Sequence, residues 1–208
     1  MPLRRSCFAI VVSLFAFAEE LEKVLQKDGY DLKRLVYEKN YSQIARYILS
    51  EQGLDYQHKP KAMLLFHRYA NEVRTAFEEH LVEAAAYATN VDKTVRMHFT
   101  ISPEHKSMFV EKMQQVVPKW EERLGVRYII DFSEQMSKTD MVALDKKGCV
   151  VRNADGSILF RPGGHGALIE NLNALESDLI FIKNIDNDIL STLMKSQVLK
   201  AYNLEIVD

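Results

Sequence analysis

Hydrophobic residues recur at helical spacing through the first quarter of the chain. From about Phe15 to Leu54, apolar positions such as Leu32, Leu35 and Val36 follow one another at intervals of one, three or four residues. This spacing places them along one side of a helix, so we expect a helical N-terminal segment over about residues 15–54. Gly53, near its end, is a residue type that favours the stop of a helix.

A strand pattern begins further along, at Thr94. Apolar and polar residues alternate strictly from Thr94 to Ile101, which predicts a strand with one buried face. A helix is expected to follow, with Ser102 as its cap and Pro103 at its first position. Its helical spacing continues to Gly125, although Pro118 is expected to kink or split it. The β-prone run at 127–132 completes a β-α-β unit, so these two strands should be parallel.

Other segments give shorter signals. Thr75-Ala76-Phe77-Glu78 has the sequence of a capping box, which predicts the start of a helix whose inward stripe includes Leu81 and Ala84. The apolar run Leu179–Ile182 is typical of a buried parallel strand. Further candidates are short strands at 141–144, 149–151 and 158–160, a turn at Asp155-Gly156, and helices at 167–175 and 189–202.

Composition favours one α/β domain over residues 1–208. The chain has 208 residues, 47% hydrophobic and 27% charged, with 27 basic against 29 acidic side chains and a formal net charge of −2. No long Lys/Arg run is present, so we expect no nucleic-acid partner. Cys7 and Cys149 are too few for a disulfide framework, and neither lies in a zinc-binding pattern.

The N-terminus leaves two interpretations open. Arg4 and Arg5 precede an apolar run from Cys7 to Phe17, which is the layout of a secretory signal. The same residues could begin a buried helix, because apolar residues continue past the potential cleavage site. The run is too short to span a membrane, so no membrane partner is expected. We favour a cytoplasmic protein, with secretion as the alternative if residues 1–18 act as a signal peptide.

A glycine-rich loop is the strongest candidate for chemistry. Arg161-Pro162-Gly163-Gly164-His165-Gly166 lies between an expected strand and an expected helix. Three glycines in four positions leave backbone N–H groups uncovered, so a phosphate, ribose or base could approach the main chain closely. The alternative is a tight connection whose glycines only supply positive φ angles.

Three other places could bind parts of a nucleotide. Asp186 follows the apolar run 179–182, where a carboxylate could hold Mg²⁺ against phosphates, although Asp186 or Asn187 could equally cap the next helix. Lys61, with Lys59 nearby, lies in a Pro-Lys loop from which an ammonium could reach a phosphate, or could simply be solvated. The polar stretch 131–140 could form a pocket rim or a surface loop. The histidines have no metal-ligand spacing.

Read in order, these motifs resemble those of the nucleotide-sugar pyrophosphorylases, a group of glycosyltransferase-A type nucleotidyltransferases. Pro60-Lys61 is similar to their proline-lysine element, 162–166 to the glycine-histidine loop of the uridylyltransferase branch, and 182–187 to that branch's strand ending in Asp-Asn. A closer match, over about 15–187, is to the bacterial domain of unknown function 4301 family. It is carried by 98–105, 160–173 and 181–187.

The resemblance implies a partial glycosyltransferase-A or Rossmann-like three-layer sandwich with a mostly parallel central sheet. It also implies attack of a sugar 1-phosphate on the α-phosphate of a nucleoside triphosphate, with pyrophosphate released. Nucleoside triphosphates, nucleotide-sugars and sugar phosphates are the partners expected. The residues implied are Lys61 on phosphate, Asp186 on Mg²⁺, Gly163, Gly164, His165 and Gly166 along the nucleotide or sugar, and Gln135 and Thr139 near the base.

The chain also departs from these enzymes at both ends. No Gly-Gly-x-Gly-Thr-Arg type triphosphate loop precedes Phe15, and only 21 residues follow Asn187, so the chain looks truncated at both ends. We therefore expect weak or no activity alone, with a partner chain or a homo-oligomer as a way to complete the site. The alternatives are a non-catalytic module that binds nucleotide-sugars, and a truncated product whose exposed sheet edges would aggregate.

Overall fold

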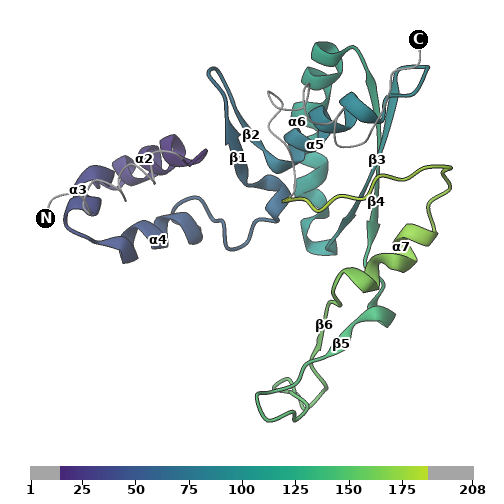
Figure 1. The fold of residues 1–208 in the computed structure, drawn as a ribbon. Helices are drawn as coiled ribbons and strands as arrows, with labels where there is room; N and C mark the ends of the chain where they lie inside the picture. Colours follow the sequence, from purple (N-terminus) through teal and green to yellow (C-terminus); the bar gives the residue numbers. More distant parts are fainter. Residues whose placement is uncertain (1–14, 187–208) are drawn as a thin grey trace, which may run out of the picture. The chain divides into compact units, whose positions relative to one another are not determined.

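The computed structural model describes residues 15–186 (Figure 1). The chain divides by its contacts into two compact units. Unit 1 combines the chain up to Ala88 with the segment that begins at Lys183, and unit 2 is Thr89–Ile182. The apolar run that could be a signal, apart from its last residues, lies outside the described residues. So do Asn187 and the helix expected at 189–202. The assignment of residues 1–208 to one domain stays a prediction.

The described part of unit 1 begins with three helices, which agrees with the helical segment expected at about 15–54. They are α2 (Ala18–Lys27), α3 (Leu32–Tyr37) and α4 (Tyr41–Leu49). Asp31 caps α3 by accepting a hydrogen bond from the backbone N–H of Arg34 at 2.7 Å, and Asn40 caps α4 in the same way through Gln43 at 3.3 Å.

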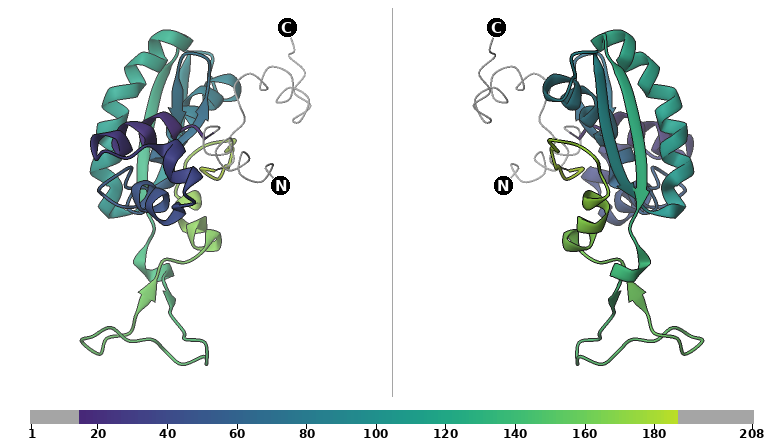
Figure 2. Two further views of the ribbon diagram at one scale, coloured as in Figure 1. Left: turned by 90° about the vertical axis from the view of Figure 1, so that its left-hand side faces the viewer. Right: turned by 90° about the vertical axis from the view of Figure 1, so that its right-hand side faces the viewer.

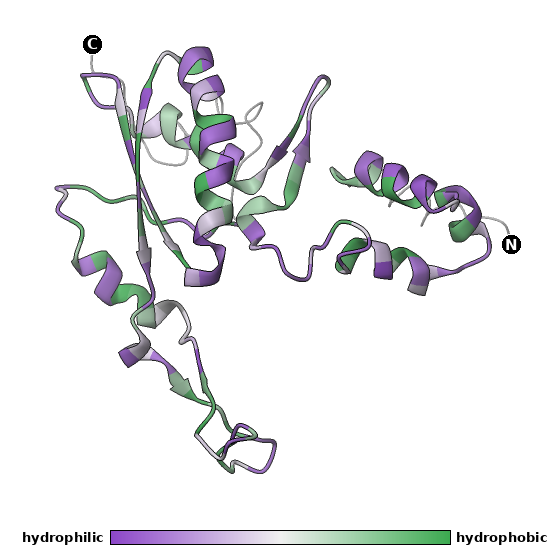
Figure 3. Cartoon of the chain, turned by 180° about the vertical axis from the view of Figure 1, so that it is seen from behind, coloured by the Kyte–Doolittle hydropathy of each residue, from purple (hydrophilic) through white to green (hydrophobic). Residues whose placement is uncertain are grey.

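The expected apolar stripe forms the core of this helical segment. In Figure 3, the hydrophobic side of α2 is turned toward α4, and its hydrophilic residues lie on the opposite side. The burial of these apolar side chains is the main contribution to the stability of these short helices. Isolated helices of this length are only marginally stable in water. The buried members are Leu21, Leu25, Leu32, Leu35, Val36, Ile44, Tyr47 and Leu54.

One polar interaction sits at the edge of this core. The Tyr47 hydroxyl donates to Asp28, and Gln52 Nε2 donates to the same carboxylate oxygen at 3.0 Å. These hydrogen bonds lower the pKa of Asp28. Burial, followed by the contact with Asp28, raises the pKa of Tyr47 to about 12. The pair links the end of α2 to α4.

The rest of unit 1 is a hairpin and a helix. Strands β1 (Leu65–Arg68) and β2 (Val73–Thr75) pair antiparallel, a hairpin that the apolar pattern did not indicate. Helix α5 (Ala76–Tyr87) follows directly and contacts both strands. The predicted capping box is confirmed, because Thr75 Oγ1 accepts from Glu78 N–H at 3.3 Å and Glu78 Oε2 accepts from Thr75 N–H at 3.1 Å.

Unit 2 contains the predicted β-α-β unit. Strand β3 (Thr94–Ile101) pairs in parallel with β4 (Arg127–Glu134), in unbroken register from Thr94 opposite Arg127 to Ile101 opposite Glu134. Helix α6 (Lys106–Leu124) connects them and lies along the strand pair (Figure 2). The helix continues through Pro118 and is not split, and it ends at Gly125 with a φ of +66°.

The start of α6 differs from the expectation. A 3-10 turn, η2 (Pro103–His105), precedes the helix, and the Ser102 side chain makes no capping hydrogen bond. Proline is nevertheless at the first position of that turn, where its missing N–H costs nothing. The helical region therefore begins at Pro103 as predicted, but its first turn is a 3-10 turn and the α-helix itself begins at Lys106.

The second half of unit 2 has little regular structure. Strands β5 (Met141–Val142) and β6 (Phe160–Arg161) pair antiparallel, and two turns between them use Gly148 (φ +81°) and Gly156 (φ +83°). The turn expected at Asp155-Gly156 is therefore confirmed. The helix expected at 167–175 is shorter, because α7 spans only Ile169–Asn173 and follows the 3-10 turn η4 (His165–Leu168). Another 3-10 turn, η3 (Ser137–Thr139), precedes β5.

The buried parallel strand expected at Leu179–Ile182 is wrong. These residues have no strand conformation, and the side chains of Leu179 and Ile182 are each 72% exposed. A short apolar run does not specify its partner, and a strand forms only where neighbouring backbone groups pair with it.

The described residues therefore form an α/β structure with three sheets of two strands each, of which only β3–β4 is parallel. The mostly parallel central sheet that we expected is not formed by them. Between residues 15 and 186, no helix is long and apolar enough to cross a membrane.

Candidate functional site

Two predicted site residues of unit 1 meet. Lys61 begins the 3-10 turn η1 (Lys61–Met63), which follows Pro60 and contacts α5. Its Nζ lies 2.8 Å from Oδ2 of Asp186, 125 positions later in the chain. Both side chains remain largely in contact with solvent, at 64% and 46% exposure, so both charges are accessible to a ligand.

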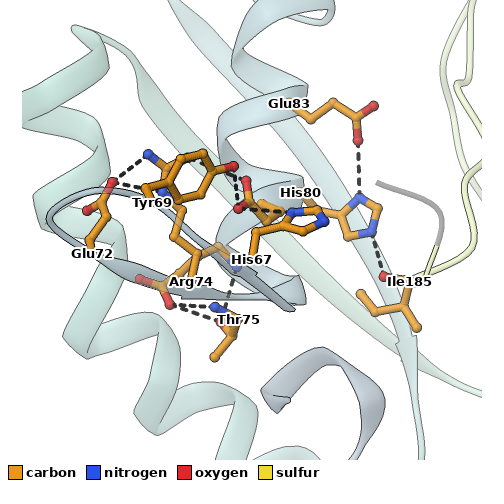
Figure 4. Close-up of polar contacts among 10 residues, drawn as sticks. His67, Tyr69, Glu72, Arg74, Thr75, His80, Glu83 and Ile185 are labelled. Carbon is orange, nitrogen blue, oxygen red and sulfur yellow. Dashed lines mark hydrogen bonds and ion pairs between the residues drawn. The ribbon is translucent and has the colours of Figure 1, made fainter. Parts of the chain in front are cut away.

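The backbone before Asp186 is held by α5. His80 Nε2 donates a hydrogen bond to the carbonyl oxygen of Ile185 at 3.0 Å, and Lys183 Nζ forms an ion pair with Glu83 Oε1. Figure 4 shows the His80 ring between the Glu83 carboxylate and this carbonyl group. The segment that carries Asp186 is thus fixed by two side chains of one helix.

A second buried network lies on the same helix. The Glu79 carboxylate, only 1% exposed, accepts a hydrogen bond from the Tyr69 hydroxyl at 2.7 Å and another from Arg74 Nη1 at 3.4 Å. His67 Nδ1 lies 3.3 Å from it (Figure 4). The Arg74 guanidinium also stacks over the Tyr69 ring at 4.0 Å and donates to Glu72 at 2.9 Å. This network attaches the β1–β2 hairpin to α5.

The other predicted site residues lie in unit 2 and form a group of their own. Gln135 Nε2 donates to Thr139 Oγ1 at 3.3 Å. A Cβ at Gly163 would lie 2.8 Å from the Thr139 carbonyl oxygen and 3.5 Å from Gln135 Nε2. Gly163 is therefore required for the close approach of its backbone to the 135–139 turn. The structure joins three of the residues expected along a nucleoside.

The loop glycines do not serve a positive φ angle. Positive φ occurs at Gly29, Gly125, Gly148 and Gly156, and the loop glycines are not among them. At Gly164 and Gly166, an added Cβ would meet no atom within 4 Å, so the backbone there is open to approach. This result removes positive φ as the reason for these glycines, whereas the close packing at Gly163 keeps a tight connection as an explanation for that position. The His165 backbone begins η4.

The ends of the parallel strands are tied to the helix after this loop. Asn171, 5% exposed in α7, donates through Nδ2 to Ser133 Oγ at 2.8 Å and to the Glu134 carbonyl oxygen at 2.9 Å. His98 Nε2 lies 2.8 Å from the same Ser133 hydroxyl. These bonds fix the carboxyl ends of β3 and β4 to α7.

The sequence pattern did not identify His80 and Glu83 as part of a site. A signal existed, because α5 carries apolar residues on most sides, including Phe77 and Leu81, so some of its charged residues had to be buried. We expected its inward stripe to be purely apolar. Spacing along one helix does not show which distant segment pairs with the buried charges.

Asp186 is the predicted metal ligand. Its surroundings are compatible with a metal ion whose other ligands are waters and phosphate oxygens rather than further side chains of this chain. Among the residues with described positions, no group of three or more His, Cys, Asp or Glu side chains could hold a metal ion. Mg²⁺ commonly uses one or two carboxylates together with waters and the phosphates of a ligand. A single accessible carboxylate beside a lysine is compatible with that arrangement.

Comparison with known proteins identifies the family of this chain. None of the curated proteins and none of the solved structures compared matches the chain. One family model, described as a domain of unknown function (DUF4301), matches residues 4–204. Because that match covers nearly all of the 208 residues, the chain belongs to the DUF4301 family.

Proposed function

We propose that this chain is a nucleotidyltransferase-like protein related to the sugar-1-phosphate uridylyltransferases, with a partial glycosyltransferase-A type fold. The observation that carries the proposal is the 2.8 Å contact between Lys61 and Asp186. The β3–α6–β4 unit supports the fold, because its parallel pair and helical crossover are the repeating unit of such sandwiches.

The Lys61–Asp186 pair suits a ligand that combines phosphate with a divalent cation. An exposed ion pair contributes only about 0–1 kcal/mol to stability, so its two partners can separate at little cost. Lys61 would then neutralise phosphate oxygens, and Asp186 would contribute to holding Mg²⁺. A bound Mg²⁺ would add charge neutralisation on the phosphates.

In the proposed reaction, an oxygen of a sugar 1-phosphate forms a bond to the α-phosphorus of a nucleoside triphosphate. The bond from that phosphorus to the oxygen bridging to the β-phosphate breaks, and pyrophosphate leaves with the electron pair. Such a transfer depends on positioning and charge stabilisation more than on covalent help from the protein. Lys61 would stabilise charge on the phosphates. Taken by themselves, Gln135, Thr139 and the 163–166 loop of unit 2 are proposed as a group that binds a base or a sugar.

The direct test measures pyrophosphate released from a panel of nucleoside triphosphates and sugar 1-phosphates in the presence of Mg²⁺. We expect Lys61→Ala and Asp186→Asn to lower kcat/KM by roughly a hundredfold, the loss typical of one electrostatic contact in a transition state. Exchanging the two charges, Lys61→Asp with Asp186→Lys, should preserve the ion pair yet leave the protein inactive. Silence of the wild-type chain across the panel, including at protein concentrations high enough for a homo-oligomer to complete the site, would contradict the transferase proposal.

The matched control is another exposed ion pair of unit 1. Arg34 and Glu38 lie 2.8 Å apart with exposures of 76% and 46%, close to those of Lys61 and Asp186. Arg34→Ala should leave the rate unchanged, because Arg34 lies on α3 and pairs with Glu38 at the end of that helix, not with a proposed site residue. An equal loss in both variants would show that the loss reflects general surface charge.

A non-catalytic nucleotide-sugar binding module is the second candidate. It is favoured by the open backbone at Gly164, where nothing lies within 4 Å of an added Cβ. A nucleotide-sugar at about 100 times its Kd should then stabilise the chain by about 2.7 kcal/mol, seen as a rise in melting temperature. Gly164→Phe should abolish that rise without lowering the melting temperature of the ligand-free protein. A rise that survives this substitution would contradict binding at the loop.

A further inference from the structure

Two side chains of α5 hold the segment before Asp186 at two successive points. Glu83 binds the ammonium of Lys183, and His80 binds the carbonyl group of Ile185 at 3.0 Å. His80 and Glu83 are three residues apart, so they project from the same face of the helix. Both are buried, at 6% and 2% exposure.

We propose that His80 and Glu83 are positioning residues that hold Asp186 against Lys61, a role that rests on the proposed function of that pair. Asp186 is the residue after Ile185, so fixing the Ile185 carbonyl restricts where the carboxylate can lie. Lys61 is carried by η1, which contacts the same helix. Helix α5 is therefore the common support for both members of the pair.

The exposed pair needs such support. A lysine and an aspartate that are both about half exposed gain little from each other, because water screens their charges and their side chains lose freedom on pairing. The contact alone could not select one position for a segment 125 residues distant in sequence. Anchors next to the pair can supply that selection, and the contacts at Lys183 and Ile185 lie within three residues of Asp186.

The buried ion pair between Glu83 and Lys183 selects one position of the 183–186 segment on α5. Glu83 Oε2 is buried and accepts no hydrogen bond within residues 15–186, although His80 Nδ1 lies 3.7 Å from it. A buried carboxylate with an incomplete set of partners is costly, and apolar residues of similar volume are often at least as stabilising. What such a pair supplies is selectivity, because an uncharged side chain at position 183 would leave the buried Glu83 Oε1 without a cationic partner. The segment is thereby fixed in one register on α5.

The orientation of His80 follows from its acceptor. A carbonyl oxygen can only accept, so the hydrogen in this contact is on Nε2 of His80. Nδ1 then faces Glu83. Glutamine at position 80 also offers an N–H donor at the end of its side chain, whereas leucine fills similar space without a donor. These two replacements separate the hydrogen bond from the packing.

Carbodiimide cross-linking measures the proximity of Lys61 and Asp186 without a nucleotide. The reagent activates a carboxylate, an adjacent amine displaces the activated oxygen, and the resulting amide is detected by mass spectrometry of the digested chain. The Lys138–Glu170 pair provides an internal reference, because its atoms lie 3.1 Å apart and its side chains are 61% and 45% exposed, almost as in the Lys61–Asp186 pair. The measured quantity is the ratio of the two cross-links.

We expect His80→Leu to lower this ratio roughly fivefold, as the loss of one buried hydrogen bond permits. His80→Gln should restore it to near the wild-type value. Since His80→Leu could also unfold unit 1, a second variant combines Glu83→Gln with Lys183→Met, which removes the anchor without leaving a lone buried charge. It should lower the ratio as well, while the melting temperature shows that the chain remains folded.

An unchanged ratio in both the leucine variant and the double variant would overturn the positioning role. So would a glutamine variant that behaves like the leucine variant, because the effect would then come from packing rather than from the donated hydrogen bond. The pyrophosphate assay tests the proposed transferase activity, and the cross-linking ratio tests the positioning role, so either proposal can be rejected without the other. A His80-dependent cross-link in a chain that transfers no nucleotide would reject the transferase and retain the anchoring of Asp186.

Discussion

Gly53 lies directly against the backbone of Tyr47. A Cβ at position 53 would be 1.8 Å from the Tyr47 carbonyl oxygen, which also accepts a hydrogen bond from Leu54 N–H at 2.7 Å. Helix α4 already ends at Leu49, so this glycine is not the helix stop that its sequence position suggested. Its role is to let the chain after α4 fold back onto the helix.

We therefore expect Gly53→Ala to destabilise the chain by about 3 kcal/mol, because the conflict is with backbone that cannot move without displacing Leu54 from the core. Chemical denaturation followed by circular dichroism measures the change. Gly164→Ala is the matched control, since its Cβ would meet no atom within 4 Å and its φ of −72° suits alanine. Equal effects of the two substitutions would contradict the close approach at Gly53.

Removal of the Glu79 carboxylate should be among the most damaging changes in unit 1. Glu79→Ala removes one carboxylate partner of the Arg74 guanidinium, which is 5% exposed, and one acceptor of the Tyr69 hydroxyl. Breaking a buried ion pair in this way costs about 3–5 kcal/mol. Tyr69→Phe removes only one hydrogen bond and should cost about 1 kcal/mol. Thermal unfolding of both variants tests the order, and a Tyr69→Phe loss as large as that of Glu79→Ala would contradict it.

Local signals in the sequence predicted elements whose determinants are themselves local. The capping box at Thr75, the alternation from Thr94 to Ile101 and the glycine at the end of α6 each specify a structure through neighbours within a few residues. The parallel pairing of β3 and β4 followed because a helical crossover of that length joins parallel strands.

The failures concern partners distant in sequence. Leu179–Ile182 has the composition of a buried strand, yet composition does not provide the backbone partners that make one. The burial of His80 and Glu83 depends on Lys183 and Ile185, more than 95 residues away, and no periodicity within α5 encodes that contact. For the same reason the pairing of Lys61 with Asp186 could be proposed from motif order but was visible only in three dimensions.

Replacement of Pro118 should make the chain more stable rather than less stable. It lies inside α6 and is exposed, so its ring contributes little packing while it deprives the Gln114 carbonyl group of a helical hydrogen bond. Pro118→Ala should stabilise the chain by up to about 3 kcal/mol. Pro103→Ala is the control, because proline at the first position of η2 is favourable. A neutral result for Pro118→Ala would show that α6 has adapted fully to its proline.

The Asp28–Tyr47 contact makes stability depend on pH in the acid range. Hydrogen bonds from Tyr47 and Gln52 lower the pKa of Asp28 in the folded chain below its ordinary value of about 3.9. The unfolded chain therefore binds the proton more readily. The contribution of Asp28 is fully present above the ordinary pKa and is lost as the pH falls through the lower, folded value.

Acid unfolding of the wild type and of Tyr47→Phe measures this contribution. Phenylalanine retains the ring in the core but donates no hydrogen bond, so the pKa of Asp28 should rise toward its ordinary value. The variant should be less stable at neutral pH and should lose less of its remaining stability between about pH 4 and pH 2. The carboxyl resonance of Asp28, followed by NMR, reports the pKa directly. Parallel acid-unfolding curves for the two proteins would mean that the lowered pKa of Asp28 comes from some other group, because only the Tyr47 hydroxyl differs between them.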